Sequence, residues 1–356
     1  MKSTARLEER FATSHLLNTS RHAFSTVASV SIRMKLTYYD IRGVFGILPT
    51  PATSDASEWS TKNSVNLPEV EKLVRLMVDA KVDLIATTGT FGECATLTRE
   101  ELVSLVECVV QTNSRSRPVF AGVTTLNTRD TIALARQLIE VGADGLFVGR
   151  PMWLAMDDDA IVRYYEDIAR AMPGVPLVVY DNPVAFKGKI SPAAYLRLAK
   201  IPEVVASKHT GGPQLLADLD AVGDRIRILP LATAWLDAAQ AFPDRAIAAW
   251  SGSVACAPKF NMALAHAILM KDWTRAKALS DEANWAEAAM FANGDLAAFM
   301  DYSIQIGHLR FKSAGLIDPG PPRPPYLFLP DTYRDGAIEC GRRWKGLENR
   351  TAARAA

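Results

Sequence analysis

Short apolar runs alternate with longer amphipathic stretches from about Tyr38 to Trp250. The runs are rich in β-branched residues and contain few polar ones, which is typical of strands that helices cover on both faces. The pattern therefore predicts eight strands, at Gly43–Leu48, Leu84–Thr87, Val119–Gly122, Gly145–Val148, Leu177–Tyr180, Val204–Lys208, Ile226–Leu229 and Ala246–Trp250.

The stretches between the strands carry recognisable helix ends. Thr98-Arg99-Glu100-Glu101 is a capping box, in which the first and last side chains satisfy free backbone N–H groups. Ser191 followed by Pro192 is a typical helix start. Gly142 ends the helix expected at Asp130–Val141, because glycine tolerates the left-handed conformation of a C-terminal cap.

Eight strand–helix repeats predict an α/β fold, namely a (β/α)₈ or TIM barrel, which typically takes about 250 residues. The alternative is an open doubly wound sheet. That fold usually has fewer units and a glycine-rich nucleotide turn, and neither G-x-G-x-x-G nor a phosphate-binding loop occurs in this sequence.

Beyond Ser253 the pattern predicts a helical appendage, with helices at Ala257–Met270, Trp273–Ala292 and Leu296–Ser313. The proline-rich segment Asp318–Pro330 cannot form a regular helix and is expected to run extended. We divide the chain into a disordered N-terminal extension (1–37), the barrel (38–253), C-terminal helices with the proline-rich segment (254–330) and a C-terminal tail (331–356).

Residues 1–33 differ from the rest, with ten Ser or Thr and four Arg. This composition predicts disorder and fits either a transit peptide or sequence upstream of a start at Met34. The whole chain has 356 residues, of which 49% are hydrophobic and 22% charged, and its net charge is +1. These values predict a soluble globular protein without the charge footprint of nucleic-acid or acidic-membrane binding.

The four cysteines are scattered, which argues against a zinc site or a disulfide framework and predicts a reducing, cytoplasmic location. No apolar run approaches the ~20 residues needed to cross a bilayer. We therefore expect no membrane partner.

Lys208 ends one of the expected buried strands. Burial costs an ammonium group its hydration, so an unpaired lysine lowers its pKa and becomes a neutral amine. Such an amine attacks carbonyl groups and forms a Schiff base. For this segment alone, a lysine whose side chain reaches solvent is an equally weighted alternative.

Other unusual residues fall at the carboxyl ends of the strands, where barrel enzymes hold their active sites. The backbone amides of Gly89–Gly92 and the Thr90 hydroxyl suit a carboxylate. Tyr180 suits proton transfer and Lys208 suits condensation with a ketone. Each feature alone also has a structural explanation, but together they predict a site for an α-keto acid such as pyruvate.

Trp153 and Trp250 follow two other strands and are either core aromatics or part of the site. His209 is expected to serve packing rather than ligand binding. No cluster of His, Asp or Glu at metal-ligand spacing follows the strands. We therefore expect no metal, and no cofactor besides the covalent imine on Lys208.

From Gly43 to Tyr326 the chain resembles the pyruvate-dependent lysine aldolases, the superfamily of dihydrodipicolinate synthase and N-acetylneuraminate lyase. Three motifs carry the resemblance, namely Gly89-Thr90-Phe91-Gly92-Glu93, Tyr180-Asp181-Asn182-Pro183 and Ser207-Lys208. The resemblance implies that Thr90 and Phe91 bind the pyruvyl carboxylate, that Tyr180 is the proton shuttle, and that Lys208 forms the imine.

The departures from that superfamily indicate the second substrate. Trp153 stands where the synthases have a tyrosine, and Ala185 where dihydrodipicolinate synthases have an arginine for the aldehyde's carboxylate. A site with Phe91, Trp153 and Trp250 suits an aromatic partner.

The segments Thr-Gly-Thr-Phe-Gly-Glu, Pro-Met-Trp and Gly-Pro-Pro-Arg-Pro-Pro-Tyr resemble the hydratase-aldolases of polycyclic aromatic hydrocarbon catabolism. These include the hydroxybenzylidenepyruvate and carboxybenzalpyruvate enzymes. The resemblance implies a homotetrameric lyase that cleaves an arylidene pyruvate into an aromatic aldehyde and pyruvate. The alternatives are a dihydrodipicolinate synthase or another pyruvate-dependent aldolase, and a non-catalytic regulatory barrel that binds a small molecule.

Overall fold

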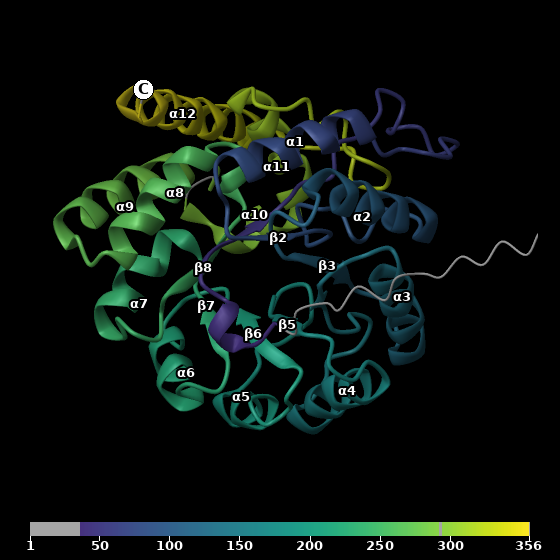
Figure 1. The fold of residues 1–356 in the computed structure, drawn as a ribbon. Coiled ribbons are helices and arrows are strands. Elements are labelled where there is room, and N and C mark those ends of the chain that lie inside the picture. The colour runs from purple at the N-terminus through teal and green to yellow at the C-terminus, as the bar shows by residue number, and fades with distance from the viewer. Residues whose placement is uncertain (1–35, 292–293, 356) are drawn as a thin grey trace, which may run out of the picture. The chain divides into compact units, whose positions relative to one another are not determined.

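A computed structural model of the chain describes residues 36–291 and 294–355. Eight parallel strands alternate with helices around a barrel (Figure 1). The strands are β1 (Gly43–Ile47), β2 (Leu84–Ala86), β3 (Val119–Val123), β4 (Gly145–Val148), β5 (Leu177–Tyr180), β6 (Val204–Lys208), β7 (Arg227–Leu229) and β8 (Ala248–Ser251). The helices between and after them are α1 (Leu67–Asp79), α2 (Arg99–Asn113), α3 (Thr128–Glu140), α4 (Asp158–Ala171), α5 (Pro192–Leu198), α6 (Leu215–Val222), α7 (Trp235–Ala241) and α8 (Pro258–Leu269).

Each strand pairs with its neighbours in the chain, in the order β7-β6-β5-β4-β3-β2-β1-β8. The barrel closes between β7 and β8. There the N–H of Trp250 donates to the carbonyl of Pro230 (2.9 Å), and Leu231 forms a β-bridge with Trp250. The predicted (β/α)₈ barrel is confirmed, and the open doubly wound sheet is wrong.

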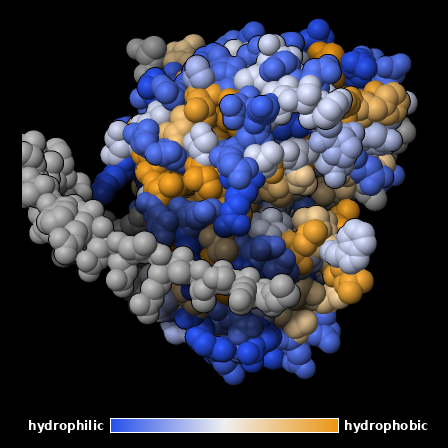
Figure 2. Space-filling model, turned by 90° about the vertical axis from the view of Figure 1, so that its right-hand side faces the viewer, coloured by the Kyte–Doolittle hydropathy of each residue, from blue (hydrophilic) through white to orange (hydrophobic). Residues whose placement is uncertain are grey.

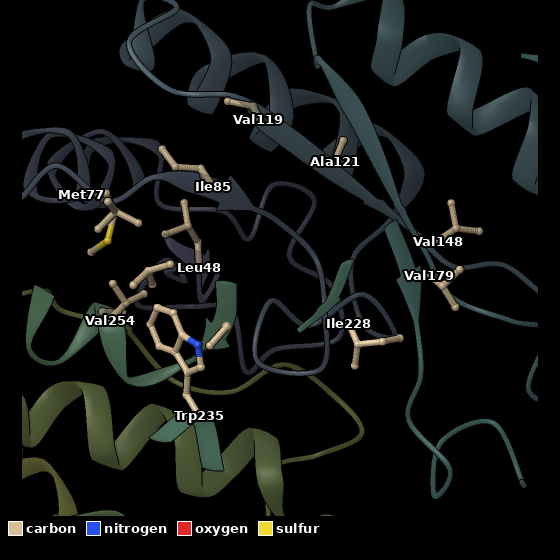
Figure 3. Packing of buried hydrophobic residues seen from close by; sticks show 14 of the residues in the cluster. Leu48, Met77, Ile85, Val119, Ala121, Val148, Val179, Ile228, Trp235 and Val254 are labelled. Carbon is tan, nitrogen blue, oxygen red and sulfur yellow. The ribbon is translucent and has the colours of Figure 1, made fainter. Parts of the chain in front are cut away.

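Two apolar layers follow from the alternation of side chains along each strand. One cluster fills the barrel and includes Phe45, Phe147 and Tyr180. The other lies between the strands and the helices, where Figure 3 shows Ile85 and Val179 among the buried side chains. A residue's position in its strand therefore decides whether its side chain faces the barrel interior or the helices.

The expected helix ends are confirmed. Thr98 accepts a hydrogen bond from the backbone of Glu101 and completes the capping box of α2. Ser191 caps α5 in the same way. Gly142 follows α3 with a φ of +114°, a conformation that favours glycine.

The appendage contains α9 (Trp273–Ala288), α10 (Leu296–Asp301), α11 (Ser303–Ala314) and α12 (Asp331–Ala355). The single helix expected over 296–313 is interrupted at Tyr302. The segment 331–356, which we set apart as a tail, instead contains α12, a helix that packs on α11 (Figure 1). Its Trp344 is buried, and the indole N–H donates to Glu287 (3.1 Å).

Most of the expected N-terminal extension, residues 1–35, lies outside the described residues. Leu36 and Tyr38 pack against the apolar cluster inside the barrel. No helix in the described part of the chain is both long and apolar enough to cross a membrane. On the face shown in Figure 2, apolar residues form small groups between polar ones.

Candidate active site

Lys208 lies inside the barrel at the end of β6. It pairs in register with Tyr180 of β5, and paired residues of parallel strands point to the same face. The residue is only 5% exposed. Its Nζ lies 3.7 Å from the ring centroid of Trp250 and 4.8 Å from that of Tyr180. Two aromatic faces therefore surround the amine.

Burial lowers the pKa of Lys208 to about 7, although the charge of Asp181 opposes this shift. Asp181 itself is bound to Arg150 at 2.9 Å. Near neutral pH, a substantial share of Lys208 is thus the neutral amine that attacks carbonyl groups.

Tyr180 joins the lysine to the loop after β2. Its hydroxyl oxygen lies 2.5 Å from Oγ1 of Thr90 and accepts the Thr90 backbone N–H at 3.2 Å. The ring stacks on Phe147 with centroids 4.4 Å apart. Gly89 lies next to both rings, since a Cβ there would lie 3.9 Å from the Tyr180 hydroxyl and 3.3 Å from Phe147. Burial raises the pKa of Tyr180, which keeps it a phenol that can donate a proton.

The loop from Thr88 to Glu93 is held in an unusual backbone conformation. Both of these residues have positive φ angles, 46° and 55°, which cost energy outside glycine. Gly92 is required because a Cβ there would lie 2.6 Å from the backbone nitrogen of Thr88. The surrounding structure must therefore stabilise this loop.

Glu93 connects this loop to distant parts of the chain through its buried carboxylate. One of its oxygens, Oε1, lies 2.8 Å from Nε2 of His308 and accepts from Nη1 of Arg323 at 2.6 Å. Arg323 also donates to the backbone carbonyls of Thr50, Pro51 and Ser64. Burial opposes ionisation of Glu93, but His308 and Arg323 outweigh it and lower its pKa. This cluster connects α11 and the proline-rich segment to the loop from Thr88 to Glu93.

A cavity of about 200 Å³ lies beside Thr90 and Tyr180, and residues of α10 and α11 form part of its wall. Much of its wall is apolar, formed by Met152, Val184, Ala185, Phe186, Met300 and Ile304. This volume lies below the range of about 300–1,000 Å³ typical of sites for drug-sized ligands. The cavity thus suits a small ligand with a polar end at Tyr180 and an apolar body.

Two tryptophans expected to hold an aryl ring are placed differently. Trp153 lies in the loop after β4, outside the cavity, with 74% of its surface exposed. Trp250 is buried in the barrel, where its face is covered by Lys208 and its indole N–H donates to the carbonyl of His209 (2.8 Å). The geometry gives Trp250 a role in seating the lysine, and it gives Trp153 no contact with the cavity.

The Phe91 ring also points away from the cavity. It packs edge-on against Phe311, with centroids 6.3 Å apart, and the guanidinium of Arg310 lies 4.9 Å from its centroid. Gly252 leaves room for the ring, since a Cβ there would lie 2.9 Å from Phe91 Cε2. Only the backbone of Phe91 can take part in the predicted carboxylate site, because its side chain anchors the loop to α11.

His209 forms internal hydrogen bonds, in agreement with its expected packing role. Nδ1 accepts from the N–H of Gly211 (2.9 Å), so Nε2 carries the proton and donates to Asp218 (3.0 Å). Among the described residues, no group of three or more His, Cys, Asp or Glu could hold a metal ion.

Sequence reasoning missed several residues near the site. Asn182, inside a motif that we quoted, donates weakly to Thr90 (3.4 Å) and Tyr180 (3.5 Å). Arg150 lies two residues after β4 and is buried, so it is, like Lys208, a buried cation at a strand end. Arg323 gave a weaker signal, a lone cation between prolines.

A buried lysine and tyrosine at adjacent strand ends of a (β/α)₈ barrel suit the class of barrel enzymes that act on carbonyl compounds. The dihydrodipicolinate synthetase family model matches residues 46–232. Trans-2'-carboxybenzalpyruvate hydratase-aldolase of Nocardioides sp. (strain KP7) is 47% identical over 322 residues, which is 89% of this chain and 97% of that protein. This chain belongs to the dihydrodipicolinate synthetase family, and the resemblance expected from the sequence is confirmed.

A second relative, trans-O-hydroxybenzylidenepyruvate hydratase-aldolase of Pseudomonas putida, is 39% identical over 317 residues, covering 88% of this chain and 96% of that protein. Among solved structures, one described as PhdJ bound to substrate intermediate superposes with a TM-score of 0.88 and 51% identity. It covers 89% of this chain and 99% of that one. Dihydrodipicolinate synthase of Acinetobacter baumannii complexed with pyruvate has a TM-score of 0.71 and 23% identity, over 85% and 99% of the two chains, and shares the fold.

Proposed function

We propose that this chain is a lyase, a Schiff-base hydratase-aldolase that cleaves an arylidene pyruvate into an aromatic aldehyde and pyruvate in aromatic hydrocarbon degradation. The observation that carries the proposal is the buried amine of Lys208, with a pKa near 7, beside the Tyr180–Thr90 pair. Full-length relatives named as hydratase-aldolases support the reaction.

Binding begins with the α-keto acid end of the substrate. The backbone amides of Gly89–Gly92 and the Thr90 hydroxyl receive the carboxylate, as at other backbone anion sites. The neutral Lys208 amine then attacks the keto carbon, and loss of water from the carbinolamine gives a protonated imine. Tyr180 lies beside the lysine and supplies and removes the protons of these steps.

The imine then drives hydration. The C=N⁺ group withdraws electrons through the conjugated double bond, so water adds at the benzylic carbon and the resulting enamine is protonated at the carbon next to the imine. Loss of the benzylic hydroxyl proton breaks the bond between these two carbons and releases the aldehyde. Protonation and hydrolysis of the remaining enamine release pyruvate and restore Lys208.

The apolar wall of the cavity accommodates the aryl group. Met152, Phe186 and Ile304 offer it contacts without a charge. Ala185 lines the same wall, at the position where dihydrodipicolinate synthases carry an arginine. An aldehyde with a carboxylate at that position would therefore lack a cationic partner.

A substrate comparison tests the proposal against its main alternative. Purified protein with pyruvate and salicylaldehyde should form a conjugated product that absorbs in the ultraviolet, and aspartate semialdehyde should be a poor acceptor. Faster turnover of aspartate semialdehyde would favour a dihydrodipicolinate synthase. Including 2-carboxybenzaldehyde and fused-ring aldehydes assigns the ortho group and the ring number.

We also propose a cytoplasmic homotetramer that needs no metal and no cofactor beyond the imine. We expect this assembly from the family resemblance. Closed symmetry would make the contacts between its subunits self-complementary. Light scattering checks it, and a particle of 38.8 kDa, the mass of one chain, would contradict it. Activity that survives extensive treatment with a chelator supports the absence of a metal, and its loss would contradict it.

A further inference from the structure

A second layer of polar residues lies directly outside the barrel wall, behind Lys208. Side chains alternate along a strand, so the neighbours of the inward-facing Tyr180 and Lys208 point outward. These neighbours are Asp181 and Ser207, and both contact the hydroxyl of Tyr195 on α5 (3.3 Å and 3.2 Å). The catalytic pair and this outer layer are therefore built on the same strand ends.

Arg150 binds the carboxylate of this layer. Its Nη2 donates to Asp181 Oδ1 at 2.9 Å and to the carbonyl of Gly188 at 2.8 Å. The two side chains are only 1% and 4% exposed. The guanidinium also lies 5.4 Å from the centroid of Phe186, whose ring meets that of Tyr180 edge-on. Burying both charges carries a large desolvation cost, which their mutual attraction does not always offset.

We propose that Arg150 is a positioning residue, which keeps Lys208 nucleophilic by neutralising the carboxylate of Asp181 behind it. The inference rests on the proposed imine chemistry of Lys208. The backbone N–H of Asp181 donates to the carbonyl of Lys208 (3.2 Å), so without Arg150 the uncompensated Asp181 charge would act on the ammonium across the strand and the lysine would hold its proton. With Arg150 in place, the carboxylate is satisfied and the amine is released for attack.

The electrostatics agree with this geometry. Asp181 is the charged group that raises the pKa of Lys208, against burial, which lowers it. Burial raises the pKa of Asp181, and the charge of Arg150 is the largest of the effects that lower it. Tyr180 is the titratable group beside the amine, and His209, Tyr195 and Tyr165 lie around the carboxylate and its arginine.

The test is the pH dependence of imine trapping. The rate at which pyruvate and cyanoborohydride label Lys208 is measured between about pH 5 and pH 10, and its midpoint reports the neutral amine. In Arg150→Met the midpoint should rise by about one pH unit, because the Asp181 charge is unmasked. In Asp181→Asn it should fall by about one unit, because Arg150 then acts on the lysine alone. The double variant should return toward the wild-type midpoint.

Two further readouts separate this role from a merely structural one. Arg150→Lys keeps the charge, so its midpoint should stay near wild type even if the altered support of Phe186 lowers kcat. Asp181→Asn is nearly isosteric and provides the decisive shift if Arg150→Met does not fold. Midpoints that stay at the wild-type value in Asp181→Asn and, if it folds, Arg150→Met overturn the inference. Absence of labelling in the wild type at every pH overturns the proposed function instead.

Discussion

Lys208 and Glu93 are both buried at the carboxyl end of the barrel, and their surroundings differ in kind. Lys208 lies between the rings of Trp250 and Tyr180, and the carboxylate that acts on it is bound to Arg150. Glu93 instead shares one oxygen between His308 and Arg323. Aromatic faces attract an ammonium only weakly, whereas two direct charged hydrogen bonds are strong.

The two environments shift ionisation in opposite senses. Burial lowers the pKa of Lys208 to about 7, so the charged form is disfavoured. At Glu93 the hydrogen bond to His308 and the charge of Arg323 help to outweigh burial and lower the pKa, so the charged form is favoured. A buried charge with poor partners becomes reactive, and one with good partners becomes a structural anchor.

The largest contrast is expected from Lys208→Met. Turnover should fall to background because the nucleophile is lost. The variant should nevertheless be more stable than the wild type at pH 7, because the wild-type chain loses a proton from Lys208 on folding. Between the native pKa of about 7 and the ordinary value of 10.5, the unfolded wild type holds more protons, so its stability rises with pH. Thermal unfolding at several pH values should show the advantage of the variant shrinking toward pH 10.5; an advantage that does not change with pH contradicts this account.

Glu93→Gln should have the opposite effect on stability. It leaves the buried guanidinium of Arg323 without its carboxylate, which typically costs about 3–5 kcal/mol. Urea unfolding measures the loss. The control is Glu71→Gln, which removes an exposed partner of Arg75 and should change stability by less than about 0.5 kcal/mol. Equal effects of the two substitutions would show that the cluster is no anchor.

Tyr180→Phe should act on chemistry rather than on stability or imine formation. The phenol carries the proton transfers, so its removal should lower kcat by about 10²-fold or more, while Lys208 still traps pyruvate. Tyr164→Phe is the matched control, since that hydroxyl is also buried but bonds to the carbonyl of Gly149 (2.9 Å). A Tyr180→Phe enzyme near wild type would assign the protons to another group.

The sequence predicted much of this because the relevant signals were local. Each strand was a short apolar run, and Lys208 and Tyr180 stood out as polar residues at strand ends. Thr90 was predicted from the glycines around it. These features depend on residues within a few positions of each other.

The failures involve contacts between distant parts of the chain. Arg323 reaches Glu93 across 230 positions, and His308 reaches it across 215. Phe91 and Trp153 were expected to favour an aromatic substrate because of their residue type. The Phe91 ring instead packs against Phe311 of α11, and the Trp153 side chain is exposed in the loop after β4. The break at Tyr302 and the helix at 331–355 likewise depend on how the appendage packs.

Trapping of the imine tests the central claim most directly. Wild-type protein and Lys208→Met are incubated with pyruvate and borohydride, digested and compared by mass spectrometry. The account predicts one reduced pyruvyl group on the wild-type peptide that contains Lys208, and none at that position in the variant. A wild-type peptide without the group, or the group on another lysine, would contradict the account.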